Sequence, residues 1–103
     1  MDLALAYVPC SNEEEAHILA QSCVEKRLAI CANVLPQMTS FYHSDGKVVN
    51  EAESLLLLKH IPHKFDELKS YLEEHHSYHT PCVTQIQLHN TLSAYLDWAK
   101  SQQ

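Results

Sequence analysis

Hydrophobic and polar positions in the first quarter of the chain follow two different periods. The apolar run Leu3–Val8 is typical of a buried strand, whereas the apolar residues between positions 16 and 28 follow the helical period of about 3.6. Ser11 or Asn12, each followed by glutamates, supplies a capping box in either of two registers. The chain is therefore predicted to begin with a strand and a helix that shows one apolar face to a sheet.

The longest predicted element is a hairpin that turns at Asp45-Gly46. Gly46 is the only glycine among 103 residues, and an Asp-Gly pair suits the positive φ angles of a tight hairpin turn. The first arm, from Ala29–Val34 onward, is interrupted near Pro36, whose missing N–H predicts a bulge or an edge. The return arm contains the apolar block Leu55–Leu58. Each arm spans roughly ten residues against ~5–6 in a typical strand, so we expect the hairpin to overhang the sheet and engage a neighbouring subunit.

The second half of the chain predicts a helix, a strand and a short final helix. Pro62 lies in the first turn of the second helix, where its missing N–H costs nothing. The predicted buried stripe of this helix consists of Phe65, Leu68, Tyr71, Leu72 and His75. Val83–Leu88 alternates as a strand does, and Asn90 with Thr91 is expected to cap the terminal helix.

The predicted order is strand–helix–strand–strand–helix–strand with one helix added. Right-handed crossovers turn this order into an α+β fold, a ferredoxin-like βαββαβ sandwich whose four-stranded antiparallel sheet carries both main helices on one face. An extra C-terminal helix and the long hairpin between the second and third strands complete it. Residues 1–103 contain no repeat or linker and are predicted to form a single domain. A core this small favours oligomerisation as a source of stability.

Composition and charge exclude several classes of protein. The chain is 46% hydrophobic and 19% charged, as globular proteins are, and its formal net charge of -6 without a Lys/Arg cluster argues against a nucleic-acid partner. The segment MDLALAYVPC lacks a basic region and is too short for a membrane span, so we expect a cytoplasmic protein without a membrane partner. Four cysteines without zinc-like spacing are interpreted as reduced, mostly buried thiols: Cys10, Cys23, Cys31 and Cys82.

Three of the eight histidines crowd into His75–His79, where the second helix is predicted to end. Pro81 disfavours helical backbone at the residue before it, so this segment is expected to be an extended loop. Imidazoles at this spacing can converge on copper, zinc or nickel. The alternative is that one histidine packs at the helix end while the other two are solvated.

Two further sets of residues could carry chemistry. A nucleophilic enzyme needs a cysteine or serine beside a histidine, and the candidate pairs are Cys82 with His79 and Ser77 with His76. Nothing in the sequence fixes the geometry of either pair. Glu51 and Glu53 are two apart on a predicted strand and so share a face, either as a solvated surface or as acid ligands in a cleft.

A set of short motifs runs through nearly the whole chain. They are Cys31-Ala32-Asn33, Thr39-Ser40-Phe41-Tyr42, Gly46-Lys47, Glu51, Glu53, Leu57-Leu58-Lys59, His76, Tyr78, Pro81 and Ala94-Tyr95-Leu96-Asp97-Trp98. The first predicted helix adds Glu13-Glu14-Glu15-Ala16 and Glu25-Lys26-Arg27-Leu28-Ala29. With these motifs in this order along the sequence, the chain resembles the CutA family of divalent-cation-tolerance proteins.

The resemblance implies one subunit of a tight homotrimer, built like the PII signalling proteins, with long hairpins that share strands between subunits. Family members are linked to copper and other divalent cations, and no enzymatic reaction is established for them. Their shared polar residues line clefts between subunits. The matching positions here are Asn33, Tyr42, Lys47, Glu51, Lys59, His76 and Tyr78.

The chain departs from the family pattern at three positions. Ser77 stands where the family usually has proline. His43 stands where an aromatic residue usually follows the tyrosine, and His79 replaces the acid of the usual His-Pro-Tyr-Glu-x-Pro. The added imidazoles could favour borderline metals, which prefer nitrogen donors to carboxylates, or could mean that an ancestral ligand is no longer bound. If the cleft is a metal site, we expect His76 and His79, with His43 as a third, to be the metal ligands.

Three hypotheses follow, of which an enzyme that uses Cys82 or the histidines ranks last. The first is a homotrimer that binds a divalent cation, Cu(II) in preference, with no organic cofactor and no enzymatic activity. The second is a PII-like sensor that binds a small anionic metabolite at the clefts between subunits, with Lys47 and Lys59 as anion contacts. Either protein could also bind an unidentified partner protein.

Overall fold

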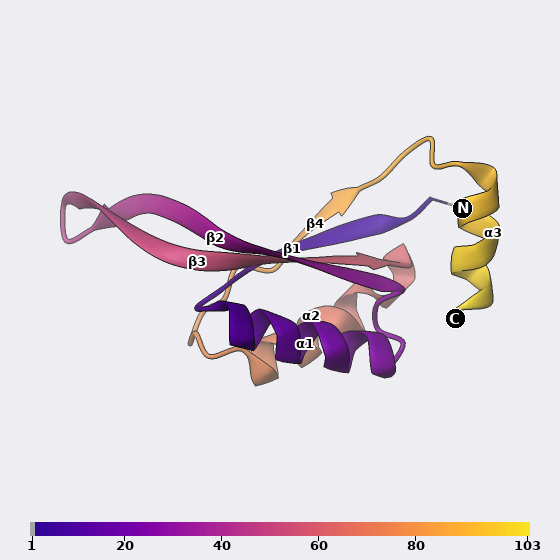
Figure 1. Cartoon of the computed structure of the whole chain (residues 1–103), viewed down its shortest axis with the longest axis horizontal. Coiled ribbons are helices and arrows are strands. Elements are labelled where there is room, and N and C mark those ends of the chain that lie inside the picture. The colour runs from indigo at the N-terminus through magenta and orange to yellow at the C-terminus, as the bar shows by residue number, and fades with distance from the viewer. Residues whose placement is uncertain (1) are drawn as a thin grey trace.

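The computed structural model describes residues 2–103 and contains one four-stranded antiparallel sheet. Its elements are β1 (Ala4–Cys10), α1 (Glu13–Glu25), β2 (Cys31–Ser44), β3 (Lys47–His60), the 3₁₀ turn η1 (Pro62–Lys64), α2 (Phe65–His75), β4 (Thr84–Gln87) and α3 (Ser93–Ser101). The strand order is β2-β3-β1-β4. Figure 1 shows α1 and α2 together on one face of the sheet and α3 beyond its end, so the predicted ferredoxin-like fold is confirmed. Within residues 2–103, every helix is too short or too polar to cross a membrane.

The core lies between the sheet and the two main helices. Burial alternates along β1, in which Ala6, Val8 and Cys10 are buried and the residues between them are half-buried. Leu56 and Leu58 of β3 pair with Val8 and Ala6, so they face the helices as well. The helices contribute Ala16, Leu19, Cys23, Leu68 and Leu72. Removing such side chains from water stabilises the fold by about 1.5–3 kcal/mol for each large one.

The opposite face of the sheet is apolar but only partly covered, and we call it the open face. Tyr7 pairs with Leu57, and Leu5 pairs with Ile86, so these side chains share that face. Ile86 is 44% exposed, and Leu35 of β2, which pairs with Leu55 on the same face, is 48% exposed. An apolar sheet surface of this kind is typical of a contact with another protein chain.

The hairpin of β2 and β3 is longer than predicted, with 14 residues in each strand, and it projects far beyond β1 and β4 (Figure 1). The register shifts between Leu35 and Met38, which confirms the predicted bulge, and Gln37 there has a φ of 63°. Asp45 and Gly46 form the two-residue turn with φ angles of 52° and 77°. Positive φ at both positions is the geometry of a type I′ hairpin turn.

Three local predictions are wrong. His75 is exposed and not part of the buried stripe of α2, because the helix ends at this residue. Asn90 and Thr91 do not cap α3, whose N-cap is Leu92 without a side-chain hydrogen bond. Only two of the four free cysteines are buried, because Cys31 and Cys82 lie on the sheet edge and in a loop.

His60 at the end of β3 is a fully buried polar side chain. Its Nδ1–H donates to the Ile61 carbonyl oxygen at 3.0 Å, and its ring stacks on Phe65. Among the described residues, His60 Nε2 is the buried side-chain nitrogen that has no hydrogen-bond partner. Burial lowers the pKa of His60, and the hydrogen bond to Ile61 opposes this only in part.

The buried imidazole predicts a loss of stability in acid. Below pH ~6.5 the unfolded chain takes up a proton that folded His60 excludes, so the free energy of unfolding should fall by up to about 1.4 kcal/mol per pH unit from this group. His60→Asn keeps a donor for the Ile61 carbonyl but does not titrate. Thermal denaturation between about pH 7.5 and 5.5 should therefore show a smaller pH effect in His60→Asn than in the wild type.

His63→Asn is the matched control, because His63 is exposed three positions further along the chain. Its pH dependence should equal that of the wild type. Identical pH dependence in all three proteins would contradict the assignment to His60.

Candidate metal centre

Three potential metal ligands converge where β1 ends. Cys10 closes β1, Glu15 lies in the first turn of α1, and His76 directly follows α2. One ligand atom from each lies within 4.8 Å of the other two. Cys10 and His76 are buried, and Glu15 is half-buried. We call these residues the Cys10 cluster.

The Glu15 carboxylate joins three segments of the chain. Its Oε1 accepts hydrogen bonds from the backbone N–H and the hydroxyl of Ser11 at 2.9 and 3.0 Å. Its Oε2 accepts the backbone N–H of Ser77 at 2.7 Å, while the N–H of Glu15 donates to Asn12 Oδ1 at 2.8 Å. These contacts form a capping box in which the Glu15 carboxylate bonds the N–H of Ser11, the residue before the N-cap Asn12. Burial alone would raise the pKa of Glu15, but the hydrogen bonds from Ser11 and Ser77 outweigh it and lower the pKa.

Two backbone contacts set the tautomer of the His76 ring. Its Nε2 lies 2.9 Å from the Pro9 carbonyl oxygen, which can only accept, so the proton is on Nε2. Nδ1 accepts the N–H of Tyr78 at 3.0 Å and lies 3.9 Å from Glu15 Oε2. Nδ1 thus lies on the side of Glu15, and its single lone pair accepts the Tyr78 N–H in the metal-free protein. A ring nitrogen held against a backbone carbonyl is the usual second-shell contact of a metal-binding histidine.

Cys10 is protonated in the metal-free protein. Burial raises the pKa of its thiol to about 12, and the negative charges of Glu15 and Glu53 add to the effect. Its sulfur lies 3.6 Å from the Val8 carbonyl oxygen, at the range of a weak S–H donor. A metal ion would bind the thiolate and so release a proton.

A line of tyrosine–glutamate hydrogen bonds continues from the Cys10 cluster onto the hairpin. The Tyr78 hydroxyl donates to Glu53 at 2.6 Å, and the Tyr42 hydroxyl donates to Glu51. Burial, followed by the hydrogen bond to Glu53, raises the pKa of Tyr78. The hydrogen bond to Glu51 raises the pKa of Tyr42. Both carboxylates are thus bound by tyrosines of the same chain.

Within a single chain, the other predicted ligand residues lie away from the Cys10 cluster. His79 is exposed with Nδ1 3.3 Å from Thr80 Oγ1, and His43 is exposed near the hairpin turn. Lys59 donates to the Tyr95 hydroxyl at 3.1 Å, whereas Lys47 begins β3 next to the turn. The two lysines therefore stand near opposite ends of one strand, about 40 Å apart at ~3.3 Å per residue. Asn33 is exposed on β2 and contacts Cys31.

Neither candidate nucleophile is hydrogen-bonded to its histidine in residues 2–103. Cys82 Sγ contacts Thr84 Oγ1 at 3.5 Å, and the Ser77 hydroxyl contacts Ser11 Oγ at 3.4 Å. The geometry gives no support to a nucleophile–base pair.

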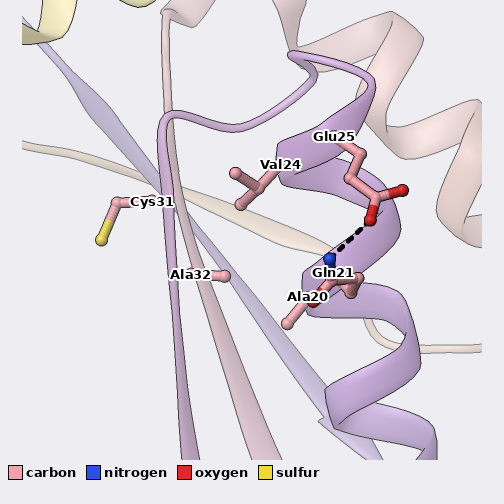
Figure 2. A pocket seen from close by; sticks show the side chains of 6 residues that line it. All are labelled: Ala20, Gln21, Val24, Glu25, Cys31 and Ala32. Carbon is pink, nitrogen blue, oxygen red and sulfur yellow. Dashed lines mark hydrogen bonds between the residues drawn. The ribbon is translucent and has the colours of Figure 1, made fainter.

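Several recesses border α1. Figure 2 shows one of about 460 Å³ between α1 and the start of β2, where Val24, Ala20 and Ala32 face one another. The Cys31 sulfur points away from the helix there, and Gln21 is hydrogen-bonded to Glu25. The second recess, about 320 Å³, adjoins the Cys10 cluster. It is lined by Ser11, Asn12, Glu14, Glu15, Ile18, Leu19, His75 and Ser77.

Comparison with known proteins gives a consistent result. Residues 4–102 match the family described as CutA1 divalent ion tolerance protein. The divalent-cation tolerance protein CutA of Thermus thermophilus is 37% identical over 99 residues, which are 96% of this chain and 94% of that protein. The CutA homolog of Xenopus laevis is 36% identical over 96 residues, 93% of this chain but only 64% of that longer protein.

The structural comparison agrees. The structure of the periplasmic divalent cation tolerance protein CutA from Archaeoglobus fulgidus superimposes with a TM-score of 0.92 at 32% identity, over 97% of both chains.

The hydrogen bonds of Glu15 predict a large effect of its removal. Glu15→Ala should lower the free energy of unfolding by about 2–4 kcal/mol, because the N–H groups of Ser11 and Ser77 lose a charged acceptor. Glu14→Ala, on the exposed neighbour, should change it by less than about 0.5 kcal/mol. Urea denaturation of the two variants tests this. Equal losses would contradict the central role of the Glu15 carboxylate.

Proposed function

Because the chain belongs to the CutA1 family of divalent ion tolerance proteins, we propose that it binds a divalent metal ion through Cys10, Glu15 and His76. The observation that carries the proposal is the convergence of a sulfur, an oxygen and a nitrogen donor within 4.8 Å. A mixed donor set of this kind suits borderline ions such as copper, zinc and cobalt. Copper(II) is the preferred ion, because it heads the affinity series of divalent first-row metals.

Ion binding changes the contacts of the cluster in a definite way. His76 Nδ1 would exchange the Tyr78 N–H for the ion, while Nε2–H would keep its hydrogen bond to the Pro9 carbonyl oxygen. Cys10 releases its proton. No reaction step is required of any residue, so the role is binding and sequestration of the ion and not catalysis.

His79 and His43 remain proposed ligands of a different kind. Both are exposed, and neither belongs to the Cys10 cluster of its own chain. They can complete a coordination sphere only when a neighbouring subunit brings them near, and His43 on the projecting hairpin is placed for such a contact.

A homotrimer is the proposed assembly. The open face leaves Ile86 and Leu35 exposed, and the hairpin carries Phe41 at 70% and Val48 at 63% exposure. Both edge strands, β2 and β4, have free hydrogen-bonding edges in one chain. Pairing β2 of one copy with β4 of the next is a heterologous contact that a closed ring satisfies.

The rival proposal, an anion sensor of the PII type, needs Lys47 and Lys59 in one site. Their separation along β3 means that the two lysines would come from different chains, and Lys59 already contacts Tyr95. The Cys10 cluster, by contrast, is complete within one chain. We therefore rank metal binding first.

We further propose a reducing compartment, the cytoplasm. All four cysteines are free thiols, and the proposed function requires Cys10 in this form. This differs from the periplasmic protein of Archaeoglobus fulgidus.

Metal binding should depend on the cluster and on pH. Titration with Co²⁺ should produce a thiolate-to-cobalt absorption band in the wild type and not in Cys10→Ser. His76→Gln, which keeps a donor for Pro9 but lacks the Nδ1 ligand, should weaken Cu²⁺ and Co²⁺ binding by about tenfold or more. The Cys10 thiol loses a proton on binding, so affinity should fall about tenfold per pH unit as pH drops from about 7.5 to 6.5.

His17→Ala is the control, because His17 is exposed on α1 and pairs only with Glu13. His79→Ala and His43→Ala test the ligands proposed from a neighbouring subunit. Equal, small losses in His76→Gln and His17→Ala would contradict the proposal and favour the anion sensor.

The trimer should depend on the hairpin turn. Sedimentation should give three times the chain mass of 11.8 kDa. Gly46→Val should shift the protein toward smaller species, because Gly46 has a φ of 77° that disfavours β-branched residues, although no atom lies within 4 Å of an added Cβ. Gly46→Asn, which tolerates this backbone, should remain trimeric. A monomeric wild type would refute the assembly.

A further inference from the structure

Two of the three residues of the Cys10 cluster are shielded from solvent. Cys10 is fully buried, and the side chain of His76 is also 0% exposed. Only the Glu15 side chain, at 14% exposure, reaches the surface. An ion that binds the cluster must therefore pass the Glu15 carboxylate.

Glu15 opens into the recess of about 320 Å³ beside α1. Ser77, whose N–H is bound to Glu15, lines the same recess. No lysine or arginine lines it, and the carboxylate of Glu14 adds a second negative charge to its wall. The recess therefore attracts cations and shares a wall with the cluster.

His75 lines this recess with a fixed tautomer. Its Nδ1 lies 2.9 Å from the Tyr71 carbonyl oxygen, which only accepts, so the proton is on Nδ1 and Nε2 carries the lone pair. The ring stacks on Tyr71 at a centroid distance of 4.1 Å. His75 is exposed, whereas its neighbour His76 is buried. Consecutive histidines thus lie outside and inside the same wall, and a backbone carbonyl sets the tautomer of each ring.

Resting on the proposed function, we propose that this recess is the access route of the metal ion and that His75 Nε2 is its first ligand. The ion binds His75 first, moves to the shared Glu15 carboxylate, and then reaches Cys10 and His76. His75 speeds loading and is not a ligand of the final site. Its removal therefore changes the rate of binding and not the equilibrium affinity.

Stopped-flow mixing with Co²⁺ tests this, with the thiolate-to-cobalt band as the signal of ion bound to Cys10. His75→Phe keeps an aromatic ring for Tyr71 but has no lone pair, and His75→Ala removes both. Each variant should load about tenfold more slowly or worse than the wild type and reach the same final spectrum and affinity. His17→Ala, another exposed histidine, should load at the wild-type rate.

Unchanged loading rates in His75→Phe and His75→Ala would overturn the access route while leaving the proposed function intact. A loss of final affinity equal to that of His76→Gln would also overturn it, because His75 would then be a ligand of the final site. A wild type without any thiolate-to-cobalt band would instead refute the proposed function, and this inference with it.

Discussion

The Glu15 carboxylate is the contact on which both the fold and the site depend. It accepts the backbone N–H groups of Ser11 and Ser77, and so connects the end of β1, the start of α1 and the loop after α2. A bound cation would compete with these N–H donors for the same oxygens. Under the proposed function, ion binding and the position of the loop after α2 would be energetically coupled, because the ion and the Ser77 N–H would share Glu15 Oε2.

The open face sets the second constraint. The helices cover one side of the sheet, and the other side keeps Tyr7, Leu57 and Ile86 in partial contact with water. A domain of this size buries a modest share of its surface, so burial of these apolar side chains in the proposed homotrimer would add stability. The same association would surround the projecting hairpin.

The overall topology and the local turns were predictable from the sequence, whereas the side-chain contacts that build the site were not. Asp45-Gly46 and Pro36 determine their own backbone, so the turn and the bulge follow from residue type. Pro9 and His76, by contrast, meet across 67 positions, and no spacing rule identifies Cys10 as a neighbour of that imidazole. Histidine content drew attention to the segment His75–His79 but could not tell which of its rings is buried. The helical period predicts a buried His75, but α2 ends at this residue and its side chain is exposed.

The strand order has a consequence for biosynthesis. β1 lies between β3 and β4, and Ala4 pairs with His60 on one side and with Gln87 on the other. At about 5–20 residues per second, a ribosome exposes β1 for several seconds before either partner exists. The β2–β3 hairpin, whose contacts are local, forms within about 1–10 μs once both arms have emerged. The projecting β2–β3 hairpin thus forms first in the nascent chain. Cys10 meets His76 only after most of the polypeptide has been made.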